Sequence, residues 1–181
     1  MVLRALPKEN VKRKILLTGR PGSGKTTLIK RVVDKLSLPA GGFYTEEIRE
    51  NGRRVGFKIV TLTGEESVLA RVNFQIEERV GKYGLALSAL EAVGVQAIRE
   101  AVRSHQLVVI DEIGPMEIRS AFFCDVVSES LDSGVSILGT ITARSLPFAD
   151  AIRKRPDVTM IEVRPDNRDQ LVTELSEQLT A

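Results

Sequence analysis

The sequence Gly19-Arg20-Pro21-Gly22-Ser23-Gly24-Lys25-Thr26-Thr27 contains the pattern G-x-x-x-x-G-K-[ST], which is typical of a phosphate-binding loop. An apolar segment, 15–17, stands directly before it, and apolar residues at helical spacing follow it. A strand, a glycine-rich turn and a helix in this order form the context that the motif requires. The alternative is a chance glycine-rich turn, and the flanking elements argue against it. The stretch therefore predicts a Walker A loop.

The residue types in this loop have chemical reasons. Glycine adopts backbone conformations that a Cβ disfavours, so the N–H groups can turn inward around phosphate oxygens, and the following helix points its positive end at the same anion. Lys25 supplies a positive charge for the β- and γ-phosphates, and the hydroxyl of Thr26 is a suitable ligand for Mg²⁺. We expect all nine residues, 19–27, to bind the nucleotide.

The composition indicates one globular domain. The chain has 181 residues, enough for a sizeable core, and a formal net charge of +2. Its single cysteine, Cys124, excludes an internal disulfide and a thiolate metal cage. Because no signal segment or membrane-length apolar run is visible, we expect a cytoplasmic monomer with one domain over 13–181. The basic extension over 1–12 could contact RNA or lipid, although a solvated lead-in is the favoured interpretation.

The segment 43–72 has a different pattern. Apolar residues alternate with polar ones over 55–59, and Asn51-Gly52 is a dipeptide that favours a type I′ hairpin turn. A second turn over 63–66 leads into another apolar stretch. These features predict an antiparallel meander between two α/β units. We interpret it as an extension of the sheet, with a separate binding module as the alternative.

The remainder alternates between helices and strands. Ser88-x-x-Glu91 resembles a capping box that opens a helix, and we expect Gly94 to divide that helix into two. The continuous apolar run 107–110 predicts a parallel strand that is covered on both faces. Further predicted elements are a helix near 118–131, strands over 135–141 and 158–163, and a helix over 168–179. This alternation predicts a three-layer α/β fold with a mainly parallel central sheet.

Asp111 and Glu112 end the apolar strand and predict a Walker B site. Ligands of open α/β sheets bind at the carboxyl ends of the strands, so this pair should face the phosphate loop. Asp111 would hold Mg²⁺ together with Thr26, because a hard cation prefers oxygen ligands. Glu112 would activate a water for attack on the γ-phosphate, which makes Lys25 and Glu112 the expected catalytic residues. The alternative is a pair of acids that merely end a strand.

Two threonines and several arginines are further candidates. Thr140 and Thr142, at the end of the next strand, could bond the water or the γ-phosphate, or could serve packing alone. An arginine could stabilise the transferring phosphoryl group, from this chain or from a neighbouring subunit, although a surface role is favoured for any single one. The candidates are Arg20, Arg119, Arg144 and Arg153.

Asn167 and Arg168 stand at the start of the last predicted helix. Asn167 could cap that helix, or the pair could lie beside the nucleobase. The lone histidine, His105, precedes the Walker B strand, and we interpret it as structural.

Several blocks in this order resemble the thermophilic nucleoside-triphosphatase family, also called the cancer-related nucleoside-triphosphatase family. The blocks are residues 19–27, Gly42-Phe43-Tyr44-Thr45-Glu46, Gly56-Phe57, Gly81-Lys82-Tyr83-Gly84, Asp111-Glu112-Ile113-Gly114-Pro115-Met116-Glu117 and Asn167-Arg168-Asp169. The resemblance runs from about residue 13 to about residue 175. The family is similar to the additional-strand, catalytic-glutamate class of P-loop proteins. Pro115 departs from a frequent lysine, and Ile118 from the usual leucine.

The resemblance implies Mg²⁺-dependent hydrolysis of ATP, GTP, CTP and UTP to diphosphate and phosphate, with little preference for the base. It also implies nucleotide contacts in two segments, the first being Gly19 to Thr26. The second comprises Leu107, Val108, Val109, Ile110, Asp111, Glu112, Ile113 and Gly114. Weak base selectivity agrees with the lack of an N-K-x-D pattern. Two other functions stay open: a kinase for a nucleoside or polynucleotide end, and a nucleotide-gated interaction protein.

Overall fold

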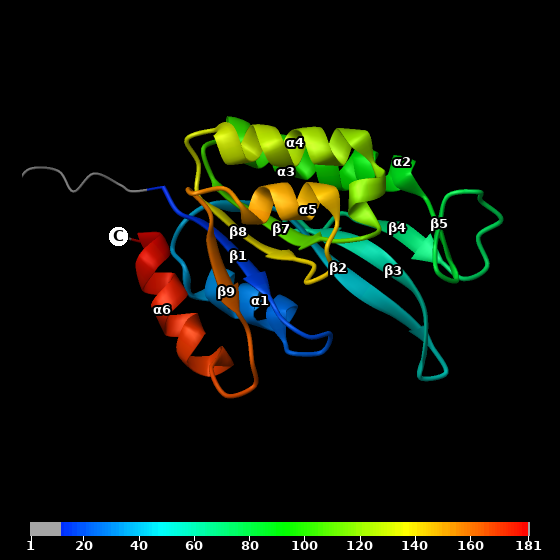
Figure 1. The fold of residues 1–181 in the computed structure, drawn as a ribbon, viewed down its shortest axis with the longest axis horizontal. Coiled ribbons are helices and arrows are strands. Elements are labelled where there is room, and N and C mark those ends of the chain that lie inside the picture. The colour runs from blue at the N-terminus through cyan, green and yellow to red at the C-terminus, as the bar shows by residue number, and fades with distance from the viewer. Residues whose placement is uncertain (1–11, 181) are drawn as a thin grey trace, which may run out of the picture.

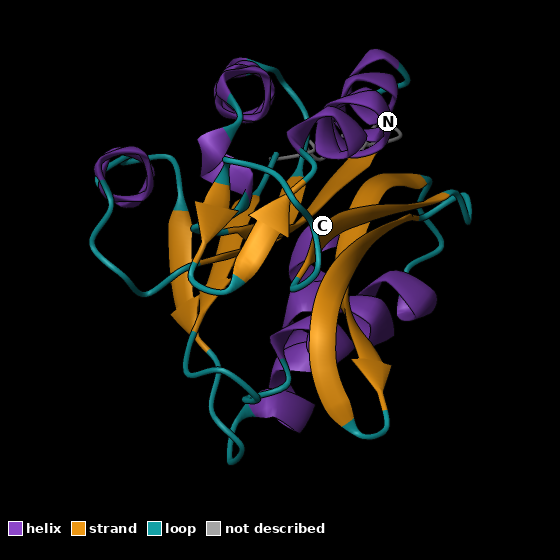
Figure 2. Cartoon of the chain, turned by 90° about the vertical axis from the view of Figure 1, so that its right-hand side faces the viewer, coloured by secondary structure: helices purple, strands orange, loops and turns teal. Residues whose placement is uncertain are grey.

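The computed structural model describes residues 12–180, so the expected basic extension, Lys12 apart, lies outside the described residues. A single sheet of nine strands lies between two layers of helices (Figure 1, Figure 2). This arrangement confirms the predicted three-layer α/β fold.

The elements follow one another in the order that the sequence predicts, with additions. The strands are β1 (Lys14–Thr18), β2 (Ala40–Glu50), β3 (Arg53–Thr61), β4 (Glu66–Arg71), β5 (Arg79–Val80), β6 (Tyr83–Leu85), β7 (Leu107–Ile113), β8 (Ile137–Ile141) and β9 (Thr159–Glu162). The helices are α1 (Lys25–Lys35), α2 (Leu87–Ala89), η1 (Leu90–Val95), α3 (Gln96–Arg103), η2 (Glu117–Arg119), α4 (Ala121–Asp132), α5 (Pro147–Arg153) and α6 (Arg168–Thr180).

The two nucleotide motifs lie on nearby strands, at the carboxyl ends of the parallel part of the sheet. The strand order is β5-β6-β4-β3-β2-β7-β8-β1-β9, and the strands from β2 to β9 in this list are parallel to one another. Strand β8 lies between β1, which leads into the phosphate loop, and β7, which carries Asp111. The sheet therefore has an additional strand between its two motif-bearing strands, as the resemblance implies.

The predicted antiparallel meander is confirmed and belongs to the same sheet. Strand β3 pairs antiparallel with β2 and with β4, and the turn residues Asn51 and Gly52 have φ values of 49° and 75°. Strand β2 also pairs in parallel with β7, where Tyr44 is opposite Asp111. Beyond that pair, the β2–β3 hairpin continues past the carboxyl ends of the parallel strands (Figure 1). The hairpin thus forms a wall beside the Walker B motif.

Each face of the sheet has its own apolar core. Helices α1 and α6 cover one face, with Leu17 and Val109 among the strand residues beneath them. Helices α3, α4 and α5 lie on the other face, where Phe43 and Ile110 are fully buried. Strand β7 contributes to both cores. Covering on both faces explains why its first four residues are all apolar.

Two predictions about the segment 87–103 are wrong. The helix is not divided at Gly94, because the chain passes through a wide π turn, η1, and continues directly into α3. An added Cβ at Gly94 would lie 3.3 Å from the ring of Phe43, so the glycine allows close packing on the sheet. Ser88 does not cap the helix either, since the capping position is Ala86. The carboxylate of Glu91 instead accepts a hydrogen bond from Ser120 Oγ at 2.7 Å.

The predicted helix over 118–131 is interrupted, and one helix is not predicted. Ser120 separates η2 from α4 and accepts a hydrogen bond from the Phe123 N–H at 3.1 Å, so it caps α4. Helix α5 comprises seven residues and starts at Pro147. Seven residues make two helical turns, which is too short for an apolar periodicity to stand out in the sequence.

Candidate functional site

The phosphate loop joins β1 to α1, and its backbone is closed by a hydrogen bond from the Ser23 N–H to the Arg20 carbonyl at 3.1 Å. Gly24, at the end of the loop, has a φ of 89°. An added Cβ there would lie 2.7 Å from Nη1 of Arg168. Glycine is therefore required at this position for two reasons: the positive φ of the backbone, and the arginine side chain that approaches where a Cβ would be.

Lys25 lies across the loop. Its ammonium group donates hydrogen bonds to the carbonyl oxygens of Gly19, at 3.0 Å, and Arg20, at 3.2 Å. These contacts hold a positive charge at the mouth of the loop, beside the first N–H groups of α1. Ser23 Oγ is buried and has no hydrogen-bond partner among residues 12–180. The loop thus offers N–H groups, a hydroxyl and a cation, the groups that bind phosphate oxygens.

Asp111 is held from the neighbouring strand. Thr140 Oγ1 of β8 donates a hydrogen bond to Asp111 Oδ1 at 2.6 Å, which gives this threonine a contact within the site. Burial raises the pKa of Asp111 above its ordinary value, and the hydrogen bond from Thr140 and the charge of Lys25 offset only part of this shift. For Thr142 the sequence allows either a role in the site or a role in packing. Its hydroxyl accepts a hydrogen bond from the Arg144 N–H at 3.2 Å.

The remaining oxygen of Asp111 suits a metal ion. Asp111 Oδ2 is buried and, within the described part of the chain, has no hydrogen-bond partner. The Thr26 side chain lies near the same carboxylate, in the first turn of α1. Residues 12–180 contain no cluster of three or more histidine, cysteine or acidic side chains that would bind a metal by themselves. A carboxylate and a hydroxyl fit Mg²⁺, which completes its coordination with phosphates and water.

Glu112 is half-buried beside Asp111. Burial raises its pKa, the charge of Asp111 raises it further, and the positive charges of Lys25 and Arg144 lower it. A carboxylate with a raised pKa accepts a proton from water more readily at neutral pH. Glu112 therefore has the surroundings of a general base.

A second glutamate, Glu117, lies next to Glu112 and was not among the predicted site residues. The point where Gly114 would carry a Cβ lies 2.8 Å from Oε1 of Glu112 and 2.9 Å from Oε2 of Glu117. Glu117 is only 4% exposed. Burial raises its pKa to about 8, with a further contribution from the charge of Glu112. The available sequence signal was its place in the block that follows Asp111.

Glu117→Gln should flatten the pH dependence of stability. The carboxyl keeps its proton in the folded protein up to a pH of about 8, whereas in the unfolded chain it ionises near the ordinary pKa of a glutamate, 4.5. Unfolding therefore releases a proton between these pH values, and the free energy of unfolding falls as the pH rises, by about 1.4 kcal/mol per unit.

Urea unfolding of the nucleotide-free protein at pH 5, 6 and 7 measures this slope. Glu117→Gln should reduce the slope, and the exposed Glu177→Gln should leave it as in the wild type. An unchanged slope in Glu117→Gln would show that Glu117 is not protonated in the folded state.

Asn167 and Arg168 occupy different surroundings. The Asn167 side chain accepts a hydrogen bond from the Arg164 N–H at 2.8 Å and donates one to the Glu162 carbonyl at 2.9 Å, so both ends of its amide order the loop before α6. The Arg168 side chain lies against Gly24, and its buried Nε has no partner within residues 12–180. Asp169 pairs with Arg31, which ties α6 to α1. Of the two, Arg168 is the one beside the phosphate loop.

The apolar half of the second nucleotide segment lies in the core. Leu107, Val108, Val109 and Ile110 are buried on the two faces of the sheet. The structure brings Asp111 and Glu112, at the end of the same strand, to the phosphate loop. By packing in the two cores, these apolar residues fix the strand and therefore the position of the acidic pair at its end.

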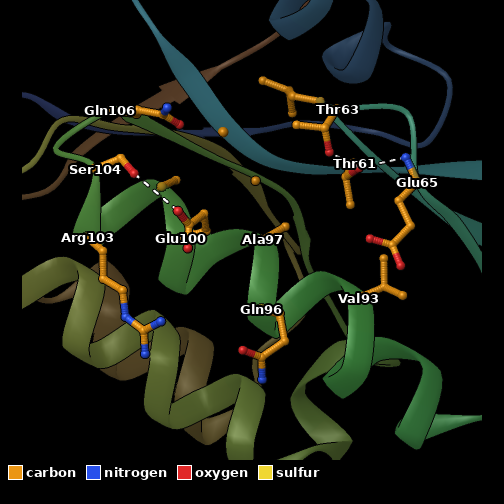
Figure 3. A pocket seen from close by; sticks show the side chains of 14 residues that line it. Thr61, Thr63, Glu65, Val93, Gln96, Ala97, Glu100, Arg103, Ser104 and Gln106 are labelled. Atoms are coloured by element: carbon orange, nitrogen blue, oxygen red, sulfur yellow. Dashed lines mark hydrogen bonds between the residues drawn. The ribbon is translucent and has the colours of Figure 1, made fainter.

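A cavity of about 320 Å³ lies away from these motifs. It is bordered by Gly41, at the start of β2, and by Gln106, directly before β7, so it is at the amino ends of the parallel strands. Figure 3 shows Glu65 and Glu100 on opposite walls of it. The phosphate loop is at the carboxyl ends of the strands. This cavity is therefore separate from the candidate site.

Comparisons with known proteins agree with this geometry. A family model described as NTPase matches residues 14–176. The nucleoside-triphosphatase THEP1 of Thermotoga petrophila is 50% identical over 162 residues, which cover 90% of each chain. The crystal structure of THEP1 from Aquifex aeolicus superimposes with a TM-score of 0.86 at 35% identity and covers 93% of this chain and 99% of that chain. The solution structure of a human cancer-related nucleoside triphosphatase gives a TM-score of 0.78 at 38% identity, with coverages of 91% and 96%.

No helix within residues 12–180 combines the length and the apolar character needed to cross a membrane.

Proposed function

Because this chain belongs to the nucleoside-triphosphatase family, we propose that it hydrolyses nucleoside triphosphates to nucleoside diphosphates and phosphate. The observation that carries the proposal is the meeting of three groups at one end of the parallel strands. These are the phosphate loop with Lys25, the buried Asp111, and Glu112 beside both. Such a set binds phosphates and places a base next to them.

The phosphate loop would hold the β- and γ-phosphates. Its N–H groups and the positive end of α1 attract the anion, and Lys25 adds a full charge. Lys25 already faces the loop through its bonds to the carbonyls of Gly19 and Arg20. On binding, the ammonium group would exchange contacts with these carbonyls for contacts with the phosphate oxygens.

Thr26 and Asp111 would hold Mg²⁺. The unpartnered Oδ2 of Asp111, within the described residues, is the observation that supports this assignment. When bound, the ion supplies positive charge to the phosphate oxygens and aligns them. Thr140 would keep the Asp111 carboxylate oriented through its 2.6 Å hydrogen bond.

Glu112 would act as the general base. It accepts a proton from a water molecule whose oxygen attacks the γ-phosphorus, while the bond from that phosphorus to the bridging oxygen breaks. The bridging oxygen leaves with the diphosphate, and the proton passes from Glu112 to solvent or to the released phosphate. The raised pKa of Glu112 favours the proton acceptance.

The chemistry of the loop before α6 supports a proposal of weak base selectivity. The Asn167 amide is occupied by backbone groups and has little left to read a base edge. Arg168 is planar and positively charged, and a guanidinium stacks on the π-face of any nucleobase. We infer that ATP, GTP, CTP and UTP all serve as substrates, with Arg168 as the neighbour of the base.

Phosphate release from each of these four triphosphates, with Mg²⁺ and without any acceptor, tests the proposal. We expect release from all four, with values of kcat/KM within about tenfold of one another, because discrimination requires a base-specific hydrogen bond. A single active triphosphate would remove the weak base selectivity. Tight binding of all four with negligible release would overturn the hydrolase and point to transfer of the phosphoryl group to an acceptor.

A further inference from the structure

Hydrolysis places negative charge on the leaving oxygen, and an arginine can stabilise that charge. The predicted candidate arginines differ in whether their side chains are already engaged in other contacts. Arg119 is paired with Glu78, which holds its guanidinium on the loop before β5. The Arg153 side chain is also occupied, by two backbone carbonyls and by Asp150. Arg20 belongs to the phosphate loop itself, and the side chain of Arg168 lies against Gly24 of the same loop, so neither comes from the strands that face the loop. Arg144 remains.

The backbone around Arg144 is held by Arg153. The Arg153 side chain donates one hydrogen bond to the Thr142 carbonyl at 2.9 Å and another to the Arg144 carbonyl at 2.8 Å. It also pairs with Asp150 at 2.8 Å, within the same helix, α5. The Arg144 N–H bonds in turn to Thr142 Oγ1 at 3.2 Å. The turn that follows β8 is thus fixed by three hydrogen bonds.

The side chain of Arg144 is exposed and has no ion pair among the described residues 12–180. Its turn follows β8, the strand between the phosphate-loop strand and the Walker B strand. The Thr142 N–H of this turn donates a hydrogen bond to the carbonyl of Ile113 at 3.0 Å, so the turn lies against the residue that follows Glu112. A rigid backbone therefore presents an uncommitted cation at the carboxyl ends of the central strands, beside the expected base.

We propose that Arg144 is a catalytic residue that stabilises the transferring phosphoryl group from within the same chain, and that Arg153 is the positioning residue that fixes its turn. The inference rests on the proposed hydrolase function. As the bond to the γ-phosphorus breaks, the bridging oxygen gains negative charge, and the guanidinium donates hydrogen bonds to it or to the γ-phosphate oxygens. No second subunit is then required to complete the site.

Steady-state phosphate release by Arg144→Ala tests the catalytic role. We expect kcat to fall by about 10³-fold, the lower end of the effect of such an arginine, with the affinity for a non-hydrolysable triphosphate within about threefold of wild type. Arg144→Lys should recover part of the loss, because the charge remains but the forked geometry does not. Arg103→Ala, which removes an exposed arginine of α3, should leave kcat unchanged.

Arg153 is tested by a double-mutant cycle. Arg153→Ala should lower kcat, but adding it to Arg144→Ala should have little further effect, since both changes remove the same guanidinium from its place. Melting temperatures identify any variant that loses its fold. Arg144→Ala alone keeps the proposal testable in that case, because no hydrogen bond between residues 12–180 depends on its side chain.

Mixing two inactive variants decides whether the arginine acts within one chain. Lys25→Ala keeps Arg144, and Arg144→Ala keeps the phosphate loop. If the arginine came from a neighbouring subunit, the mixture would recover activity. We expect no recovery, and specific activity should not depend on protein concentration.

Normal kcat in Arg144→Ala, or recovery in the mixture, would overturn the inference. If wild type releases phosphate and Glu112→Gln does not, either of those results would leave the proposed hydrolase intact. If wild type itself releases no phosphate, the hydrolase fails first.

Discussion

Glu112→Gln is expected to lower kcat for phosphate release by about 10²–10⁴-fold, the usual contribution of one general base. This corresponds to roughly 3–5 kcal/mol in the activation free energy. The amide has nearly the shape of the carboxylate and can still bond to a water, but it does not accept the proton. Binding should change little, because the proposed partner of Glu112 is the attacking water and not the phosphates.

Single-turnover release from bound ATP measures this effect, since it separates the chemical step from product release. Titration with a non-hydrolysable triphosphate measures binding alongside it. Glu177→Gln, an exposed glutamate of α6, is the matched control and should behave as wild type. Near-normal release by Glu112→Gln would remove Glu112 as the base.

Lys25→Ala is expected to weaken both binding and turnover. In the proposed site the ammonium group would bond to charged phosphate oxygens, and one such bond contributes about 1.5–3 kcal/mol, or roughly 10–10²-fold in affinity. The same positive charge stabilises the negative charge that develops in the transition state, so we expect its removal to lower kcat by a further factor of about 10²–10³. The combined loss in kcat/KM should exceed that of any other change to the phosphate loop.

Calorimetric binding of a non-hydrolysable triphosphate and steady-state kinetics measure the two parts separately. Lys35→Ala is a suitable control because Lys35 ends the same helix and, within residues 12–180, its side chain bonds only to Thr173 Oγ1, at 3.2 Å. Equal affinity in wild type and Lys25→Ala would contradict the assignment of this loop as the phosphate site. Weak binding with unchanged kcat would show that the lysine serves binding alone.

The sequence alone predicts the features that depend on neighbouring residues. The phosphate loop is one continuous stretch, and the strand that ends in Asp111 is marked by its own apolar run. The turn at Asn51-Gly52 is also local, because both residues tolerate the positive φ that a type I′ turn requires. Such features need no knowledge of the rest of the chain, and the structure contains each of them.

Local patterns misled where a distant residue competed for the same group. Ser88 and Glu91 have capping-box spacing, yet Glu91 bonds to Ser120, which lies 29 residues away. Gly94 has a low helix propensity, but its close packing against Phe43 keeps it within a continuous helix. In both cases a tertiary contact outweighs a preference of about 1 kcal/mol or less.

Only the tertiary structure shows how the site is completed. Thr140 reaches Asp111 because β8 lies beside β7, and Arg153 holds the Arg144 turn because α5 folds back on it. Glu117 shares a buried space with Glu112 because the chain turns at Gly114. None of these contacts has a spacing rule in the sequence. The sequence by itself determines the loop, the acidic pair and the alternation of elements, whereas strand order and packing decide which side chains meet, since these depend on residues far apart in the chain.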